Sequence, residues 1–315
     1  MHISRTPQDW PSAAHGCVMA LGNFDGVHQG HQAVIGQAAA IAKQQNRPLA
    51  VMSFEPHPRR FFKPDLPVLR ICPLADKLRL LRGLGVDYLY LARFNAEFAA
   101  ISAEAFVSNL LGAQLKVGHV VTGYNFAFGH KRGGDTDYLE QAAPAQGMGY
   151  SRVAAVADPQ GDVYSSTLIR EHLKAGNIAE AARLLGRPYC LTGPVIHGDA
   201  RGRELGFPTA NLRPSPLFLP AYGVYAVRFS LSDGRQWNGV ANLGIRPTVS
   251  GRACQLESHL FDCDTNLYGL EAKVELCRFI RPEQRFDGLD ALKAQIADDT
   301  RSAQRYFAKA NEGTT

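Results

Sequence analysis

An apolar run gives way to glycines and histidines in Leu21-Gly-Asn-Phe-Asp-Gly-Val-His-Gln-Gly-His31. Residues 17–21 are apolar and the segment after His31 has helical periodicity, which predicts a strand, a glycine-rich turn and a helix start. Glycines let the backbone approach a ligand closely, and the free N–H groups at a helix start attract anions. His28 and His31 lie about one helical turn apart, so both can donate hydrogen bonds to the same phosphate oxygens.

The same stretch allows three other interpretations. A Walker-type phosphate loop requires Gly-Lys-Ser/Thr, and no lysine follows these glycines. Zinc binding by His28 and His31 would need further Cys or His residues at ligand spacing, which the neighbouring sequence lacks. The third interpretation is a plain turn with two solvated histidines.

The composition limits the class of protein. The 315 residues are enough for two domains with separate cores. The net charge of +5 is spread along the chain without a long basic run, which suits a protein that handles anionic nucleotides better than a dedicated nucleic-acid binder. The six cysteines include no Cys-x-x-Cys pair, as expected for reduced thiols in the cytoplasm. With no apolar run of signal-peptide or membrane-spanning length, we expect a cytoplasmic monomer or weak oligomer that binds neither nucleic acid nor membrane.

Strands and helices are predicted to alternate over residues 1–187. Alternation of this kind predicts an α/β domain: a Rossmann-like, mostly parallel sheet with helices on both faces and with ligand at the carboxyl ends of its strands. The predicted elements after the first turn are strands at 48–53, 86–91 and 117–122, and helices at 74–84 and at 102–111, the latter capped by Ser102.

The pattern changes over residues 188–315. Short alternating segments separated by Gly, Pro, Asn and Asp predict an antiparallel β-barrel, followed by a closing helix over 289–307. The alternating segments are 222–229, 239–243, 256–261 and 272–279.

Two further loops of the first domain carry polar residues. The proline-rich loop 53–59, with Glu55, His57 and Arg59, fits a substrate wall and a rigid surface turn equally well. The glycine-rich loop 122–134 places aromatic residues beside Asn125 and basic residues after it, which suits a flat heterocycle with a phosphate.

These motifs carry a resemblance to a known family. A His-x-Gly-His set between a strand and a helix is the nucleotidyltransferase signature, and the longer string from Gly22 to His31 resembles bacterial FAD synthetases. Loop 122–134 and the segment Ser165-Ser-Thr-Leu-Ile-Arg170 also resemble that family. The resemblance implies that His28, His31 and Arg170 are catalytic. It implies nucleotide binding by Gly22, Phe24, Asp25, Gly30, Asn125, Ser165, Ser166 and Thr167, and flavin binding by Asn125, Phe126 and Phe128.

The second domain has its own signature. The stretch His197-Gly-Asp-Ala-Arg-Gly-Arg-Glu-Leu-Gly-Phe-Pro-Thr-Ala-Asn211 combines a glycine-rich flap with a hydroxyl and an amide that suit Mg²⁺, and it resembles the riboflavin kinase signature. The resemblance implies that Glu257 is the catalytic base, that Thr209 and Asn211 hold Mg²⁺, and that Arg281 and Phe286 contact flavin. It implies nucleotide binding by His197, Gly198, Arg201, Gly202, Gly206, Thr209 and Asn211.

The whole resemblance, over about residues 16–307, is to the bifunctional riboflavin kinase/FMN adenylyltransferases. It implies phosphorylation of riboflavin by ATP and Mg²⁺ in domain 188–315, and adenylylation of FMN by ATP in domain 1–187, with release of pyrophosphate. Two alternatives remain open. The first domain could adenylylate or cytidylylate another acceptor, as pantetheine-phosphate adenylyltransferases and cytidylyltransferases do, or the chain could be a flavin-sensing or RNA-binding protein with relic catalytic folds.

Overall fold

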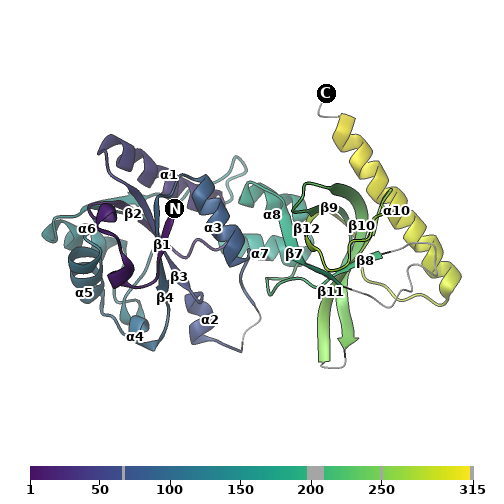
Figure 1. Ribbon diagram of the computed structural model, residues 1–315, viewed down its shortest axis with the longest axis horizontal. Helices are drawn as coiled ribbons and strands as arrows, with labels where there is room; N and C mark the ends of the chain where they lie inside the picture. Colours follow the sequence, from purple (N-terminus) through teal and green to yellow (C-terminus); the bar gives the residue numbers. More distant parts are fainter. Residues whose placement is uncertain (66–67, 197–208, 249–250, 313–315) are drawn as a thin grey trace. The chain divides into compact units, whose positions relative to one another are not determined.

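The computed structural model describes residues 1–65, 68–196, 209–248 and 251–312 (Figure 1). The chain divides into two compact units, Met1–Ser166 and Thr167–Thr315. The sequence predicts a different boundary, after residue 187, which separates the segments for the two activities. That functional boundary stays a prediction.

The first unit is built on a six-stranded sheet in the order β1-β4-β3-β2-β5-β6, in which neighbouring strands are parallel. This confirms the predicted α/β architecture. The strands at both edges, β1 and β6, were not predicted, and β1 has only three residues. The strands are β1 (His2–Ser4), β2 (Val18–Leu21), β3 (Leu49–Glu55), β4 (Tyr88–Arg93), β5 (His119–Gly123) and β6 (Gly149–Val153).

Helices cover both faces of this sheet. Successive residues of a strand point to opposite faces: in β2, Met19 belongs to one apolar cluster and Ala20 to the other. The first cluster includes Leu110 and Leu139, and the second includes Ile35 and Leu81. The helical elements are η1 (Pro7–Asp9), η2 (Ser12–Ala14), α1 (Gln29–Gln44), α2 (Pro58–Phe62), α3 (Leu74–Gly83), α4 (Ala96–Ala99), α5 (Ala103–Ala105), η3 (Phe106–Gln114), η4 (His130–Arg132) and α6 (Thr136–Ala145).

The helix predicted at 102–111 is present in two parts. Ser102 caps α5 as predicted, because its Oγ accepts a hydrogen bond from the Ala105 N–H at 3.1 Å. The chain then continues as the π-helix η3, and its last bond runs five residues back, from the Leu115 N–H to the Leu110 carbonyl at 2.9 Å.

The second unit contains a closed antiparallel barrel in the order β10-β11-β8-β7-β12-β9, as predicted. Its interior is filled by large apolar side chains from every wall, such as Leu191, Leu212, Phe229 and Leu256, all fully buried. The strands are β7 (Tyr189–Ile196), β8 (Thr209–Leu212), β9 (Gly223–Leu231), β10 (Gln236–Thr248), β11 (Gly251–Leu260) and β12 (Glu271–Pro282).

Three helices accompany the barrel in the part of the second unit that the structure describes. The closing helix α10 (Leu289–Glu312) is longer than predicted and packs on the outside of the barrel, where Ala303 and Phe307 contact Val224, Ala226 and Val240 (Figure 1). Helices α7 (Ser166–Ala175) and α8 (Ile178–Leu185) precede the barrel, and α8 contacts β7 and β12.

Candidate active sites

The first candidate site lies beside β2, where the order in which the chain adds strands to the sheet reverses. The chain passes from β2 to β3 on one side and reaches β5 on the other, so Leu21 pairs with both Met52 and Thr122. Ligands of open α/β sheets bind at such switch points, at the carboxyl ends of the strands. The two loops that leave β2 and β5 there are Gly22–His31, hereafter the histidine turn, and the loop containing Asn125.

The histidine turn is fixed to helix α1 by His28 itself. His28 is the N-cap of α1, and its Nδ1 accepts a hydrogen bond from the His31 N–H at 3.2 Å. An accepting Nδ1 carries no proton, so the neutral ring carries its proton on Nε2. The His31 N–H is therefore used by the His28 ring, and the predicted binding of an anion by this helix start and its histidines stays a prediction.

His31 is held against two rings. Its imidazole stacks on that of His28, with ring centroids 3.5 Å apart and an interplanar angle of 20°, and it meets Phe24 edge to face at 5.3 Å. A Cβ at Gly30 would lie 3.2 Å from the His28 ring. It would also lie 3.0 Å from the Cβ of Tyr164, so a side chain at this position would crowd both residues. The predicted nucleotide contact of Gly30 stays a prediction.

The backbone of the histidine turn takes unusual conformations and is tied down from several sides. Phe24, Gly26 and Val27 have φ values of 47°, 79° and 43°, which are left-handed and unfavourable for side chains with a Cβ. Asp25 is buried; its Oδ1 accepts from the Ile71 N–H at 2.9 Å, and its carbonyl accepts from Ser166 Oγ at 3.1 Å. Because Phe24 and Asp25 are buried, their side chains support the turn.

A buried lysine that the sequence did not reveal also supports this turn. Lys77 of α3 is 6% exposed, and its Nζ donates to the Asn23 carbonyl at 2.8 Å and to Ser53 Oγ at 3.2 Å. Ser53 Oγ donates to the same carbonyl at 3.0 Å. Burial lowers the pKa of Lys77, and the nearby Asp25 carboxylate opposes that shift.

The loop after β5 presents both exposed and buried predicted residues. Tyr124 and Asn125 are exposed, whereas Phe128 is buried against Phe106, with ring centroids 4.9 Å apart. Phe126 is half-buried and stacks on Phe128 at 5.8 Å. Asn125 is thus available at the carboxyl edge of the sheet, and the two phenylalanines form a wall that continues into the core.

The second candidate site is a row of polar side chains across three strands of the barrel. In the register of the sheet, Glu257 of β11 pairs with Asn211 of β8 on one side and with Asn242 of β10 on the other. Side chains of paired residues point to the same face, here the outer one, since Leu212 and Leu256 fill the interior. We call Asn211, Glu257 and Asn242 the barrel row.

Two neighbours complete this site. Gln255 Nε2 donates to Asn211 Oδ1 at 2.8 Å, which orients the amide. Thr209, two residues before Asn211 on β8, points to the same face. The register thus places Thr209, Asn211 and Glu257 on one face of the barrel, and their predicted roles stay predictions. His197, Gly198, Arg201, Gly202 and Gly206 lie outside the described residues.

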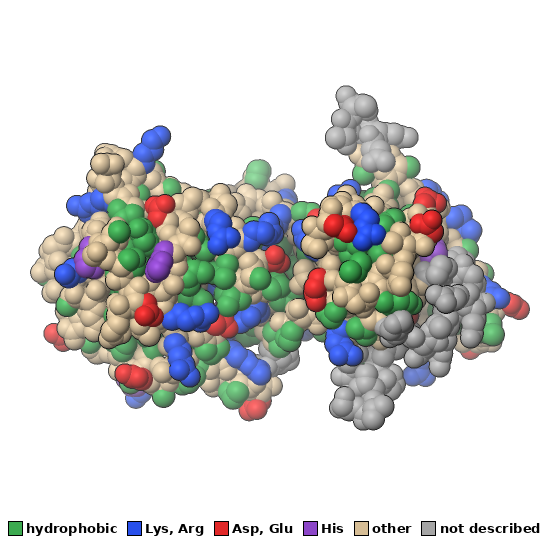
Figure 2. All heavy atoms as spheres, viewed as in Figure 1, with side chains coloured by type: hydrophobic (Ala, Val, Ile, Leu, Met, Phe, Trp, Pro, Cys, Tyr) green, Lys and Arg blue, Asp and Glu red, His purple; other side chains and the backbone are tan. Residues whose placement is uncertain are grey.

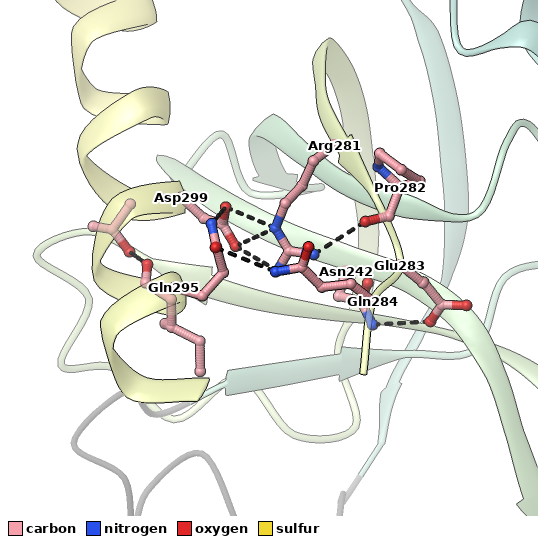
Figure 3. Close-up of polar contacts among 9 residues, drawn as sticks. Asn242, Arg281, Pro282, Glu283, Gln284, Gln295 and Asp299 are labelled. Carbon is pink, nitrogen blue, oxygen red and sulfur yellow. Dashed lines mark hydrogen bonds and ion pairs between the residues drawn. The ribbon is translucent and has the colours of Figure 1, made fainter. Parts of the chain in front are cut away.

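Arg281, predicted to contact flavin, forms an ion pair with helix α10 (Figure 3). Its Nη2 and Nε donate to Asp299 at 2.8 and 3.0 Å, and its Nη1 donates to the Pro282 carbonyl at 3.0 Å. The guanidinium also lies 5.6 Å from the ring centroid of Phe286. The two predicted flavin residues thus contact each other, and Asp299 fixes the first of them.

Replacing Asp299 by alanine is expected to destabilise the barrel. Asp299 is 4% exposed, and its loss would leave Arg281 largely buried without a carboxylate, at a cost of about 2–4 kcal/mol. Asp298→Ala is the matched control, because Asp298 pairs with Arg301 at an exposed site, where such pairs contribute about 0–1 kcal/mol. Thermal unfolding followed by circular dichroism would check both, and equal effects of the two variants would contradict the expectation.

Comparison with known proteins identifies the family. The FAD synthetase family matches residues 10–168 and the riboflavin kinase family matches residues 185–307. The bifunctional riboflavin kinase/FMN adenylyltransferase of Escherichia coli K12 is 42% identical over 306 residues, covering 97% of this chain and 96% of that protein. The chain belongs to this bifunctional family. The Listeria monocytogenes member is 40% identical, with 98% of each chain covered.

A solved structure shares the fold. A crystal structure from Streptococcus pneumoniae, titled as a macrolide-efflux protein, matches this bifunctional family member with a TM-score of 0.85 and 31% identity, covering 94% of this chain and 96% of that one. Among the described residues, none of the helices has the length and apolarity that crossing a membrane requires.

The structure brings together part of the site predicted for this bifunctional enzyme. Ser166 bonds to the histidine turn, Ser165 is half-buried beside it in the chain, and Thr167 and Arg170 begin the second unit; their nucleotide contacts stay predictions. Sequence reasoning missed Lys77 and Asn242. Asn242 could have been found, because it alternates with apolar residues in the predicted strand 239–243.

Proposed function

We propose that the chain converts riboflavin to FMN and then FMN to FAD, with the second reaction at the histidine turn. A phosphate oxygen of FMN attacks the α-phosphorus of ATP, the bond to the bridging oxygen breaks, and pyrophosphate leaves. The Nε2–H of His28 and the imidazole of His31 would donate hydrogen bonds to the phosphate oxygens as charge develops. The observation that carries this proposal is the placement of both rings, stacked, at the switch point of the sheet.

Riboflavin would be phosphorylated on the barrel row. Glu257 takes the proton of the primary hydroxyl as the γ-phosphoryl group of ATP is transferred and ADP leaves. This assignment is supported by the position of Glu257 between Asn211 and Asn242. Asn242 would orient the hydroxyl or a phosphate oxygen, and Arg281 would hold Phe286 for contact with the flavin ring.

Mg²⁺ is the metal that these donors fit. The hydroxyl of Thr209 and the amide oxygen of Asn211 are hard oxygen ligands, and Mg²⁺ keeps most of its ligands as water and nucleotide phosphate. Gln255 already orients the Asn211 amide so that its oxygen is the acceptor. When bound, the ion would neutralise phosphate charge. Within the described ranges, no group of three or more His, Cys, Asp and Glu side chains could hold a metal ion.

Removing divalent cations with EDTA is expected to stop both reactions, because Mg²⁺ neutralises the phosphate charge of ATP in each of them. Added Mg²⁺ should restore FMN and FAD formation together. Restoration by Zn²⁺ alone would contradict the magnesium assignment and favour zinc binding by His28 and His31.

The overall function is tested by a time course. The purified chain is incubated with riboflavin, ATP and Mg²⁺, and FMN, FAD and pyrophosphate are separated by chromatography. We expect FMN first, and later FAD with an equal amount of pyrophosphate. FMN without FAD would indicate another acceptor at the histidine turn, and no flavin product at all would favour a binding protein.

We further propose that the enzyme is cytoplasmic and a monomer or weak oligomer. On the face in Figure 2 its Lys and Arg side chains are dispersed among Asp and Glu.

A further inference from the structure

The buried lysine beneath the histidine turn has no role in the reactions described so far. Lys77 and Ser53 come from different elements, α3 and β3, yet both donate to the Asn23 carbonyl, at 2.8 and 3.0 Å. The Lys77–Ser53 bond of 3.2 Å closes the triangle. One carbonyl of the turn is therefore fixed by two side chains that are themselves bonded to each other.

A buried ammonium group is costly to keep. Lys77 and Leu81 are the buried residues of α3, and an apolar side chain at position 77 would fill the same space without the cost of desolvating a charge. The partners of Lys77 are the Asn23 carbonyl and Ser53, and the Asp25 carboxylate acts on its charge from the same turn. Cys72, Glu55 and Arg70 also act on this charge from outside the turn. Both hydrogen bonds of the ammonium group nevertheless go to the turn or to Ser53, which itself bonds to the turn.

The bond acts where the turn changes direction. Asn23 precedes Phe24, whose left-handed φ of 47° reverses the chain and brings the Phe24 ring against His31. Holding the Asn23 carbonyl inward keeps the Asn23 side chain on the exposed side. It also polarises the peptide group that follows. A shift of this carbonyl would move Phe24 and, with it, the support of His31.

We propose that Lys77 is a positioning residue for adenylyl transfer: with Ser53, it holds the Asn23 carbonyl and thereby the turn that carries His28 and His31. The proposal rests on the proposed role of that turn. It predicts a defect in the turnover of FMN to FAD with no defect in the phosphorylation of riboflavin, because Lys77 belongs to the first unit alone.

The test compares Lys77→Met with Arg79→Met in the full chain. Methionine keeps the length of the side chain but removes the donors, and Arg79 is an exposed basic residue of the same helix. We expect Lys77→Met to lower kcat for FAD formation at least about tenfold, with a smaller change in the KM for ATP, because groups that act in the transition state are displaced. Riboflavin phosphorylation in the same sample, and both activities of Arg79→Met, should match the wild-type enzyme.

Ser53→Ala provides a milder second variant. It removes the bond to the Asn23 carbonyl and the bond from Lys77 but keeps the Lys77–Asn23 bond, so kcat for FAD formation should fall by about threefold to tenfold. The double variant should lose little more than Lys77→Met alone, since both residues act on one carbonyl. Three results would overturn the proposal. The first is a wild-type kcat in Lys77→Met, and the second is a double variant in which the two losses of kcat multiply. The third is a loss of kcat that follows unfolding of the first unit and disappears on cooling. His28→Asn separates a failure of this proposal from a failure of the proposed function. If His28→Asn keeps full FAD formation, the proposed role of the histidine turn itself is wrong.

Discussion

Replacing His28 or His31 by alanine is expected to abolish FAD formation while FMN formation continues. Each imidazole would stabilise charge on the phosphates as pyrophosphate leaves, and loss of one such donor costs about 10²-fold or more in rate. The measurement is the initial rate of FAD formation from supplied FMN, with riboflavin phosphorylation assayed in the same sample. Loss of both activities would argue against separate sites.

His28 needs a second variant, because its Nδ1 also caps helix α1. Loss of a cap costs about 1 kcal/mol of stability, and that effect could lower activity indirectly. Asparagine is a good N-cap residue without an imidazole, so His28→Asn should keep the helix start and still lose FAD formation. Full activity in His28→Asn would show that the ring serves the helix only.

Replacing Glu257 by glutamine is expected to have the reverse effect. Without a base for the hydroxyl proton, riboflavin phosphorylation should fall by about 10²–10⁴-fold, whereas FAD formation from supplied FMN should persist. Glutamine preserves the size of the side chain in the barrel row. The pH dependence of the residual kinase rate provides a further check, because the ionisation of the base should vanish from it.

Glu271→Gln is the matched control, because Glu271 is an exposed carboxylate on β12 of the same barrel. It should leave both rates unchanged. An unchanged kinase rate in Glu257→Gln would remove this residue from the role of base and would leave the barrel row as a binding surface.

The local pattern of the chain predicted most of the fold. The strand before the histidine turn, the Ser102 cap and the alternating segments of the barrel each depend on residues close together in the sequence, and the structure confirms them. Strand β1, with three residues, is too short to give a periodic signal.

The missed parts of the sites depend on contacts between distant residues. Lys77 lies in a helix with charged neighbours, and its partner, the Asn23 carbonyl, is 54 positions away. No local pattern therefore indicates that this lysine is buried. Arg281 and Asp299 are 18 positions apart, and the periodicity of a helix or a strand does not predict a contact at that spacing. A Cβ at Gly30 would crowd Tyr164 and the His28 ring, and the close approach of Tyr164, 134 positions away, arises only in the folded chain.

The closure of the barrel has a consequence for synthesis. Its first strand, β7, pairs with its last, β12, so that Tyr189 lies opposite Leu276, and β12 also pairs with β9. During synthesis, the ribosome therefore completes most strands of the barrel before it makes β12, the strand that closes it. The sheet of the first unit, in contrast, contains no strand beyond Ser166, so it can form earlier. A chain released early, after β11, would leave β7 and β9 with open edges, which are sites for aggregation.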